Sequence, residues 1–210
     1  PRWPFEKFAL ADKTLGTQMK ATGEVMSLDR CFEGALLKAV RSLEIGVNYL
    51  SMKKLEGKNI IEIAELLSKQ DDERLFVVTQ ALRVGISEEK IHNITGYDMW
   101  FINKIKNIVD LEEDLKANGM NEDNMRLAKR YSMPDVIIAG FVGKTEEEVR
   151  NFRVSKGITP TFKMVDTCAA EFEAATPYYY SCYADEDEVK PLGDKSVIVL
   201  GSGPIRIGQG

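Results

Sequence analysis

Apolar residues recur every three or four positions between residues 46 and 157, which is the period of an amphipathic helix. The spacing predicts short helices over Ile60–Leu67 and Glu73–Val84, with Gly85 ending the second of them. Ser87 is placed to cap a third helix, because a serine hydroxyl can accept from the free backbone N–H groups of a first turn. No run in this region alternates with period two, so the region is predicted to be all-α.

The longest predicted helix follows Asp98, its expected cap, and ends at Asn118–Gly119. The side chain of Trp100, near the start of this helix, is expected to lie in the core. The buried seam of this helix is predicted from apolar spacing to be Phe101, Ile105, Ile108, Leu111 and Leu115.

Three further helices are predicted to complete the region. The first begins at Asn121 or Asp123. The second is Asp135–Ala139, which Pro134 precedes. The third begins with a capping box of Thr145 and Glu148 and ends at Gly157.

The two flanks of the helical region have other patterns. Before it, Asp29 is expected to cap a helix, whose apolar stripe needs a partner from outside the fragment. After it, Thr159–Asp166 and Tyr178–Tyr183 are predicted to be extended, and Ser196–Leu200 is predicted to be a strand that opens an α/β unit. The predicted stripe of the first helix is Phe32, Leu36, Ala39, Val40 and Leu43.

Composition narrows the possible partners. The 210-residue chain has a formal net charge of −5 and a pI of about 5.2, which argues against nucleic acid. Its apolar runs are too short to cross a bilayer, so no membrane partner is expected. Three widely spaced cysteines without a Cys-x-x-Cys pair favour reduced thiols and a cytoplasmic location. The opening Pro1–Phe5 resembles neither a leader nor a natural start, which predicts a piece of a longer protein.

The glycine-rich end of the chain is the strongest candidate for chemistry. Glycines after a strand let backbone N–H groups approach a phosphate, which makes the loop a candidate phosphate site. The loop matches neither a dinucleotide fingerprint nor a Walker loop, and a tight turn without a ligand of its own is the favoured interpretation. The candidate phosphate-binding residues are Gly201, Gly203, Arg206, Gly208 and Gln209.

A second motif, over residues 135–156, resembles a helix-turn-helix. Its second helix would open with Glu146, Glu147 and Glu148, which would meet DNA phosphates first, so a packed helical hairpin is favoured. The sequence also lacks a paired acid and base, a nucleophile with its base, and a set of metal ligands. We therefore predict no catalytic residue and no metal site.

Three stretches together resemble the large subunit of carbamoyl phosphate synthetase. They are Met19–Met26 (MKATGEVM), Val165–Phe172 (VDTCAAEF) and Val199–Gly210 (VLGSGPIRIGQG), which occur in the order and at about the separations of that family. The resemblance implies a mainly α fold, with a helical bundle-like oligomerisation domain flanked by partial α/β segments of two ATP-grasp units.

The resemblance also implies how the chain is divided. Residues 1–46 would close the first, carboxyphosphate unit, and 47–158 would form the oligomerisation domain. Residues 159–195 would be a connector, and 196–210 would begin the second, carbamoyl phosphate unit. The implied function is a non-catalytic structural module that links the bicarbonate-phosphorylating and carbamate-phosphorylating halves. A free-standing helical adaptor or regulatory protein is the alternative.

The parent enzyme implied by the resemblance is an ATP-dependent ligase of arginine and pyrimidine biosynthesis. It would use ATP with Mg²⁺ or Mn²⁺, and its ATP-grasp ligands would lie outside this chain, so the fragment itself is expected to need no cofactor and to be inactive. Expected partners are the remaining large-subunit domains and the glutaminase small subunit.

Self-association is expected from the resemblance to an oligomerisation domain. The segment Pro134–Val142 is apolar on more than one side, so part of it could face outward, although burial of both faces is an equally good interpretation. The candidate interface residues are Val136, Ile138 and Phe141.

Overall fold

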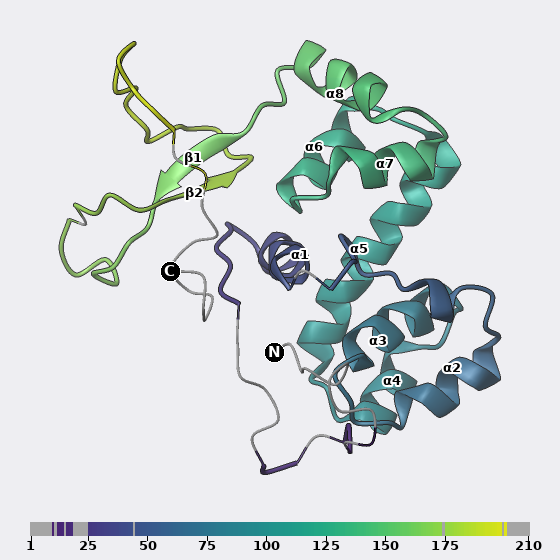
Figure 1. The fold of residues 1–210 in the computed structure, drawn as a ribbon. Helices are drawn as coiled ribbons and strands as arrows, with labels where there is room; N and C mark the ends of the chain where they lie inside the picture. Colours follow the sequence, from purple (N-terminus) through teal and green to yellow (C-terminus); the bar gives the residue numbers. More distant parts are fainter. Residues whose placement is uncertain are drawn as a thin grey trace.

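The computed structural model describes residues 10, 12–14, 16–18, 25–43, 45–173, 175–198 and 200 (Figure 1). These residues fold mainly into helices, as the sequence predicts, followed by a two-stranded sheet. The elements are α1 (Phe32–Ser42), a 3₁₀ turn (Lys53–Leu55), α2 (Ile60–Leu67), α3 (Arg74–Arg83), α4 (Glu88–Thr95), α5 (Met99–Asn118), α6 (Glu122–Arg130), α7 (Asp135–Val142), α8 (Glu146–Ser155), β1 (Thr161–Met164) and β2 (Tyr179–Cys182).

Helix α5 is the element around which the other helices are arranged. Its 20 residues make it about 30 Å long, and it contacts α1, α3, α4, α6 and α7. Figure 1 shows α2, α3 and α4 around its N-terminal part and α6, α7 and α8 around its C-terminal part. Buried side chains from all of these helices form one apolar core, so α5 joins two groups of helices into a single unit.

The predicted helix starts and stops are largely confirmed, because they depend on local hydrogen bonds. The Asp98 carboxylate accepts from the backbone N–H two residues later at 2.8 Å, and the Ser87 hydroxyl accepts from the N–H three residues later at 3.3 Å. Thr145 and Glu148 form the reciprocal capping box. Helix α5 ends at Gly119, whose φ of 66° is easily reached only by a residue without a Cβ.

The predicted seam of α5 is wrong at its first position. Phe101 is 46 % exposed, whereas its neighbour Ile102 is completely buried. Both positions fit the helical period relative to Ile105, one at four residues and one at three, so spacing alone does not separate them. The expectation that Trp100 is buried is also wrong, because its side chain is 51 % exposed.

The corrected seam predicts unequal effects for two chemically identical substitutions. Ile102→Val removes one methyl group from a fully buried site and should lower the free energy of unfolding by about 0.5–1.5 kcal/mol. Ile61→Val on α2, where the side chain is 68 % exposed, should change it much less. Urea denaturation of both variants measures the difference, and equal losses would contradict the assignment of Ile102 to the core.

Helix α1 differs from the prediction in its cap, in its buried face and in its partner. Cys31, not Asp29, occupies the cap position, and its sulfur accepts from the Gly34 N–H at 3.4 Å. The buried face contains Leu37 and Val40 together with Glu33, a charged residue that is not part of the predicted apolar stripe. Helix α1 packs against α5 within this chain, so it needs no partner from outside.

Glu33 is buried because polar groups on α5 meet it. Its Oε1 accepts from the Asn107 side chain at 2.8 Å and from the Lys104 ammonium at 3.3 Å. A buried carboxylate needs partners of this kind, since water is not available to solvate it. The burial of Glu33 therefore depends on a neighbouring helix and could not be predicted from α1 alone.

The extended segments after α8 are confirmed as strands. Strands β1 and β2 pair antiparallel, with Thr161 opposite Cys182 and Met164 opposite Tyr179. The strand predicted over Ser196–Leu200 is wrong. Within this segment, residues 196–198 and 200 are described and have no regular structure, and the side chain of Ile198 is 85 % exposed. No described segment pairs with them, so the backbone there lacks the partner that would make it a strand.

Candidate interdomain junction

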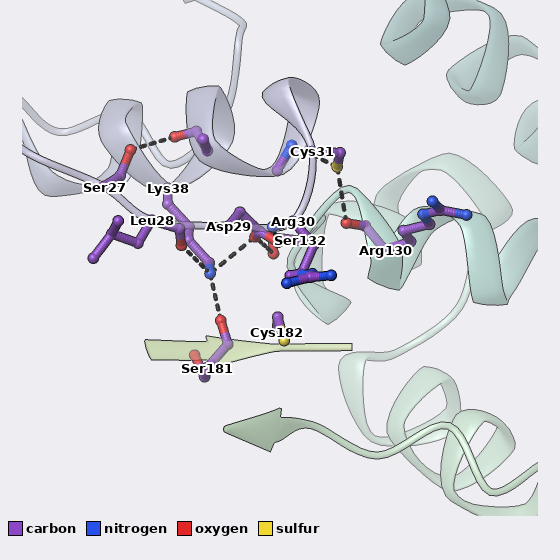
Figure 2. A network of polar contacts seen from close by, with 12 residues as sticks. Ser27, Leu28, Asp29, Arg30, Cys31, Lys38, Arg130, Ser132, Ser181 and Cys182 are labelled. Atoms are coloured by element: carbon purple, nitrogen blue, oxygen red, sulfur yellow. Dashed lines mark hydrogen bonds and ion pairs between the residues drawn. The ribbon is translucent and has the colours of Figure 1, made fainter. Parts of the chain in front are cut away.

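The segment 25–31 meets α1, the loop between α6 and α7, and strand β2 at one polar cluster (Figure 2). Asp29 is at its centre, and its side chain is only 1 % exposed. The carboxylate is 2.8 Å from the ammonium of Lys38 on α1, and it accepts from the Ser132 hydroxyl at 2.6 Å. Its other oxygen accepts from the backbone N–H of Arg30 at 2.7 Å. These contacts fix the incoming segment on the side of α1.

Lys38 extends the cluster to the hairpin. Besides Asp29, its ammonium donates to the backbone carbonyl of Leu28 at 2.7 Å and to that of Ser181 on β2. The Tyr180 ring lies beside it, with its centroid 5.6 Å from the ammonium nitrogen. Because Ser181 lies 143 residues after Lys38, one side chain holds together the segment that enters the helical unit and the hairpin that follows it.

Gly34 makes this arrangement possible. A Cβ added to this helical residue would lie 2.6 Å from Oδ2 of Asp29 and 3.2 Å from the carbonyl oxygen of Arg130. Glycine inside a helix is about 1 kcal/mol less favourable than alanine. The local cost is offset because the missing side chain leaves room for the buried carboxylate.

The loop between α6 and α7 is held in a backbone conformation that is unusual for its residue type. Ser132 has a φ of 56°, and its carbonyl accepts from the Arg41 guanidinium at 3.0 Å while its hydroxyl donates to Asp29. Beside it, the Cys31 thiol donates to the carbonyl of Arg130 at 3.4 Å. Burial raises the pKa of the Cys31 thiol, which favours its protonated, hydrogen-bonding form.

A second buried cluster holds the end of the hairpin. Asp135 is 2.7 Å from the Lys129 ammonium and 2.8 Å from Nε of Arg153, and the three side chains are at most 11 % exposed. Both cations lie beside the Tyr183 ring, at 5.0 Å and 5.9 Å from its centroid. Tyr183 follows β2 directly, so this contact docks the hairpin onto α6 and α8.

Burial alone would raise the pKa of Asp135, but its hydrogen bonds with Lys129 and Arg153 outweigh that effect and hold the pKa below its ordinary value. Burial lowers the pKa of Lys129, although Asp135 opposes the change. The cluster is therefore an ion triad whose carboxylate is stabilised in its charged form by two partners.

Three aromatic side chains gather at the start of α1 and α5. The ring centroids of Phe32 and Trp100 are 5.1 Å apart, and those of Trp100 and Phe101 are 5.0 Å apart. The ammonium of Lys104 lies 5.5 Å from the Trp100 ring. Two of the rings are about half exposed, so this aromatic cluster of Phe32, Trp100 and Phe101 forms an apolar surface next to the segment that enters α1.

The predicted interface residues of α7 are in three different environments. Ile138 is completely buried, so its assignment to an exposed interface is corrected, because its side chain forms part of the core. Phe141 is half-buried, and its ring packs 5.9 Å from that of Tyr49. Val136 is 48 % exposed. The candidate phosphate residues Gly201, Gly203, Arg206, Gly208 and Gln209 lie outside the described residues.

The α7–α8 motif is a packed helical pair, joined by the Asp135–Arg153 ion pair. Within the described ranges, no group of three or more His, Cys, Asp or Glu side chains is arranged to hold a metal ion. None of the described helices combines the length and the apolar composition that crossing a bilayer requires.

Sequence reasoning missed Lys38, Ser132 and the role of Gly34. A glycine in the first turn of a strongly amphipathic helix was the signal that could have revealed a close approach at this point. The contacts of Lys38 with the Leu28 and Ser181 backbone carbonyls carried no such signal, because any residue has a carbonyl and Ser181 lies 143 residues away in the chain.

Residues 24–157 match the family model described as carbamoyl-phosphate synthetase large chain, oligomerisation domain. The matched range covers more than half of the chain and includes all of α1 to α8. It begins before α1, which the sequence had assigned to the preceding unit. The match confirms the family resemblance that the three sequence stretches predicted.

Proposed function

The chain belongs to the carbamoyl-phosphate synthetase large-chain family, and from that premise we propose that its helical unit clamps two neighbouring parts of the large chain together. The observation that supports this most directly is the position of Lys38, which binds the incoming segment at Asp29 and the outgoing hairpin at Ser181. A spacer would keep these two segments apart. Here they lie side by side on α1 (Figure 2).

A fixed relation between the two parts has a chemical purpose in the proposed parent enzyme. One half would phosphorylate bicarbonate and the other would phosphorylate carbamate, each with ATP and Mg²⁺ or Mn²⁺. Carbamate decomposes quickly in water, so the sites that exchange it must keep their relative position and exclude solvent. The glutaminase small subunit would supply ammonia to the first half. We do not propose that the polar clusters or the cavities of the described residues carry out either phosphorylation.

Self-association is the second part of the proposal, and the aromatic cluster is its proposed surface. The family description names an oligomerisation domain, which requires an exposed, self-complementary surface. Aromatic side chains are enriched at such interfaces, and Trp100 and Phe101 are more exposed than large apolar residues usually are. Val136 alone remains exposed from the predicted α7 set, which is less apolar area than three clustered rings provide.

Trp100→Glu should weaken self-association about tenfold or more, because a charge would enter both sides of a two-fold contact. The helix should persist. Position 100 is in the first turn of α5, where a carboxylate interacts favourably with the helix dipole and can pair with Lys104 four residues later. Sedimentation velocity across a concentration series, with circular dichroism on the same samples, measures both effects.

Two matched variants locate the contact. Val136→Glu introduces the same charge on α7 and should leave the association unchanged, whereas Ile138→Glu buries a charge and should unfold the protein. If Val136→Glu dissociates the protein and Trp100→Glu does not, the interface lies on α7. A wild-type chain that stays monomeric at high concentration would contradict self-association altogether.

A further inference from the structure

A cavity of about 460 Å³ opens beside the junction, between the turn at residues 29–30, helix α6 and the chain at 157–159 and 183–185. Its volume is within the range of small-molecule sites. Three arginines are among its lining residues, Arg30 in the turn and Arg126 and Arg130 on α6. The two α6 arginines are four residues apart and therefore share a helix face.

The arginines are only partly neutralised within the protein. Arg130 has no ion-pair or side-chain hydrogen-bond partner in the part of the chain that the structure describes. Arg126 pairs with Glu122 at 2.8 Å, but both side chains are about half exposed, and such a pair is weak and exchangeable. A hydrogen bond with Tyr180 raises the pKa of Arg30, which remains charged.

Two carboxylates also line the cavity, and only one of them opposes an anion directly. Both oxygens of Asp29 are occupied by Lys38, Ser132 and a backbone N–H, and the adjacent ammonium compensates its charge. Asp185 is exposed and has no ion-pair partner among the described residues, so it reduces the positive potential without cancelling three arginines.

Tyr183 is also one of the residues that line the cavity. Burial raises the pKa of its phenol, so the hydroxyl keeps its proton. Among the described residues, no group accepts a hydrogen bond from this hydroxyl, so its donor is not used within the described part of the chain.

We propose that this cavity binds the phosphate group of a small molecule. Guanidinium groups bind phosphate through paired, charge-assisted hydrogen bonds. Arginines that come from the 29–30 turn and from two turns of α6 suit a dianion with several acceptor oxygens better than a carboxylate, which has two. The bound group would touch the incoming turn, α6 and the chain after β2, and would therefore tie together the parts that the proposed clamp holds.

The test is a titration of the 210-residue chain with inorganic phosphate at constant ionic strength, followed by amide chemical shifts in NMR. Saturable shifts are expected for residues 157–159 and 183–185. Arg130→Gln should raise the dissociation constant about tenfold. Its guanidinium makes no contact that the fold needs, so the variant should remain folded. Lys90→Gln removes the same charge from an exposed position on α4, outside the cavity, and should bind phosphate as the wild type does.

Three results would overturn the proposal. They are an absence of saturable shifts in the wild type, equal binding by wild type and Arg130→Gln, and equal shifts produced by acetate, which would indicate a general anion effect. The titration does not depend on self-association or on the clamp, because it measures binding to the chain as it is. The titration can therefore be interpreted even if the clamp proposal is wrong or the protein is monomeric.

Discussion

Replacing Gly34 with alanine is expected to lower the free energy of unfolding by about 2–4 kcal/mol, against the usual gain of a glycine-to-alanine change in a helix. The added Cβ would lie 2.6 Å from the Asp29 carboxylate. That carboxylate can move only by giving up its buried contacts with Lys38 and Ser132. Denaturant unfolding of the variant measures the loss.

Gly140→Ala is the matched control. Gly140 also lies inside a helix, it is exposed, and a Cβ there would meet no atom within 4 Å. This variant should gain up to about 1 kcal/mol. A double-mutant cycle identifies the cause, because the penalty of Gly34→Ala should largely disappear when Asp29 is also alanine. A penalty that persists in the Asp29→Ala background would show that another contact is responsible.

Asp135→Ala is expected to lower the free energy of unfolding by about 3–5 kcal/mol. It leaves the Lys129 ammonium and the Arg153 guanidinium buried next to each other without their shared anion. Asp110→Ala removes the same side chain from an exposed ion pair with Lys106 and should have little effect, since water and salt already screen that pair. Comparable losses in the two variants would contradict the importance of burial.

The Asp135 triad also predicts a pH dependence. Its partners hold the folded-state pKa below the unfolded value, which is about 3.9 for aspartate. The stabilisation is therefore complete above the unfolded pKa and is lost as the pH falls through the lower folded-state pKa. Asp135→Asn should flatten the acid limb of the stability profile, because the amide does not titrate. An unchanged acid limb would show that other carboxylates control it.

The features predicted correctly from the sequence are those decided within a few residues. A serine, aspartate or threonine before an apolar run caps a helix through its own first turn, so Ser87, Asp98 and Thr145 could be assigned without knowing their neighbours. The two strands of the β-hairpin were also predicted from the sequence as extended segments, but their pairing was not.

The incorrect predictions concern features that depend on contacts with a second segment of the chain. Asp29 fits a helix cap by sequence, yet Lys38 and Ser132 hold its side chain elsewhere, and Cys31 takes the cap. The choice between Phe101 and Ile102 depends on which side of α5 its neighbours cover, and hydrophobicity favours neither strongly. Apolar spacing restricts a helix face to within about one residue, and tertiary packing makes the final choice.

The contact of Lys38 with both Asp29 and Ser181 also has an evolutionary consequence. The unit begins and ends at neighbouring points, so its interior can lengthen, shorten or diverge without changing the separation of the flanking segments. Domains with adjacent ends are readily inserted into other chains and replaced. Helices α2 to α4, which Figure 1 shows at the far end of α5 from α6 to α8, are the natural place for such variation. The sequence should therefore be more strictly conserved at the two ends of this unit than at the many residues between them.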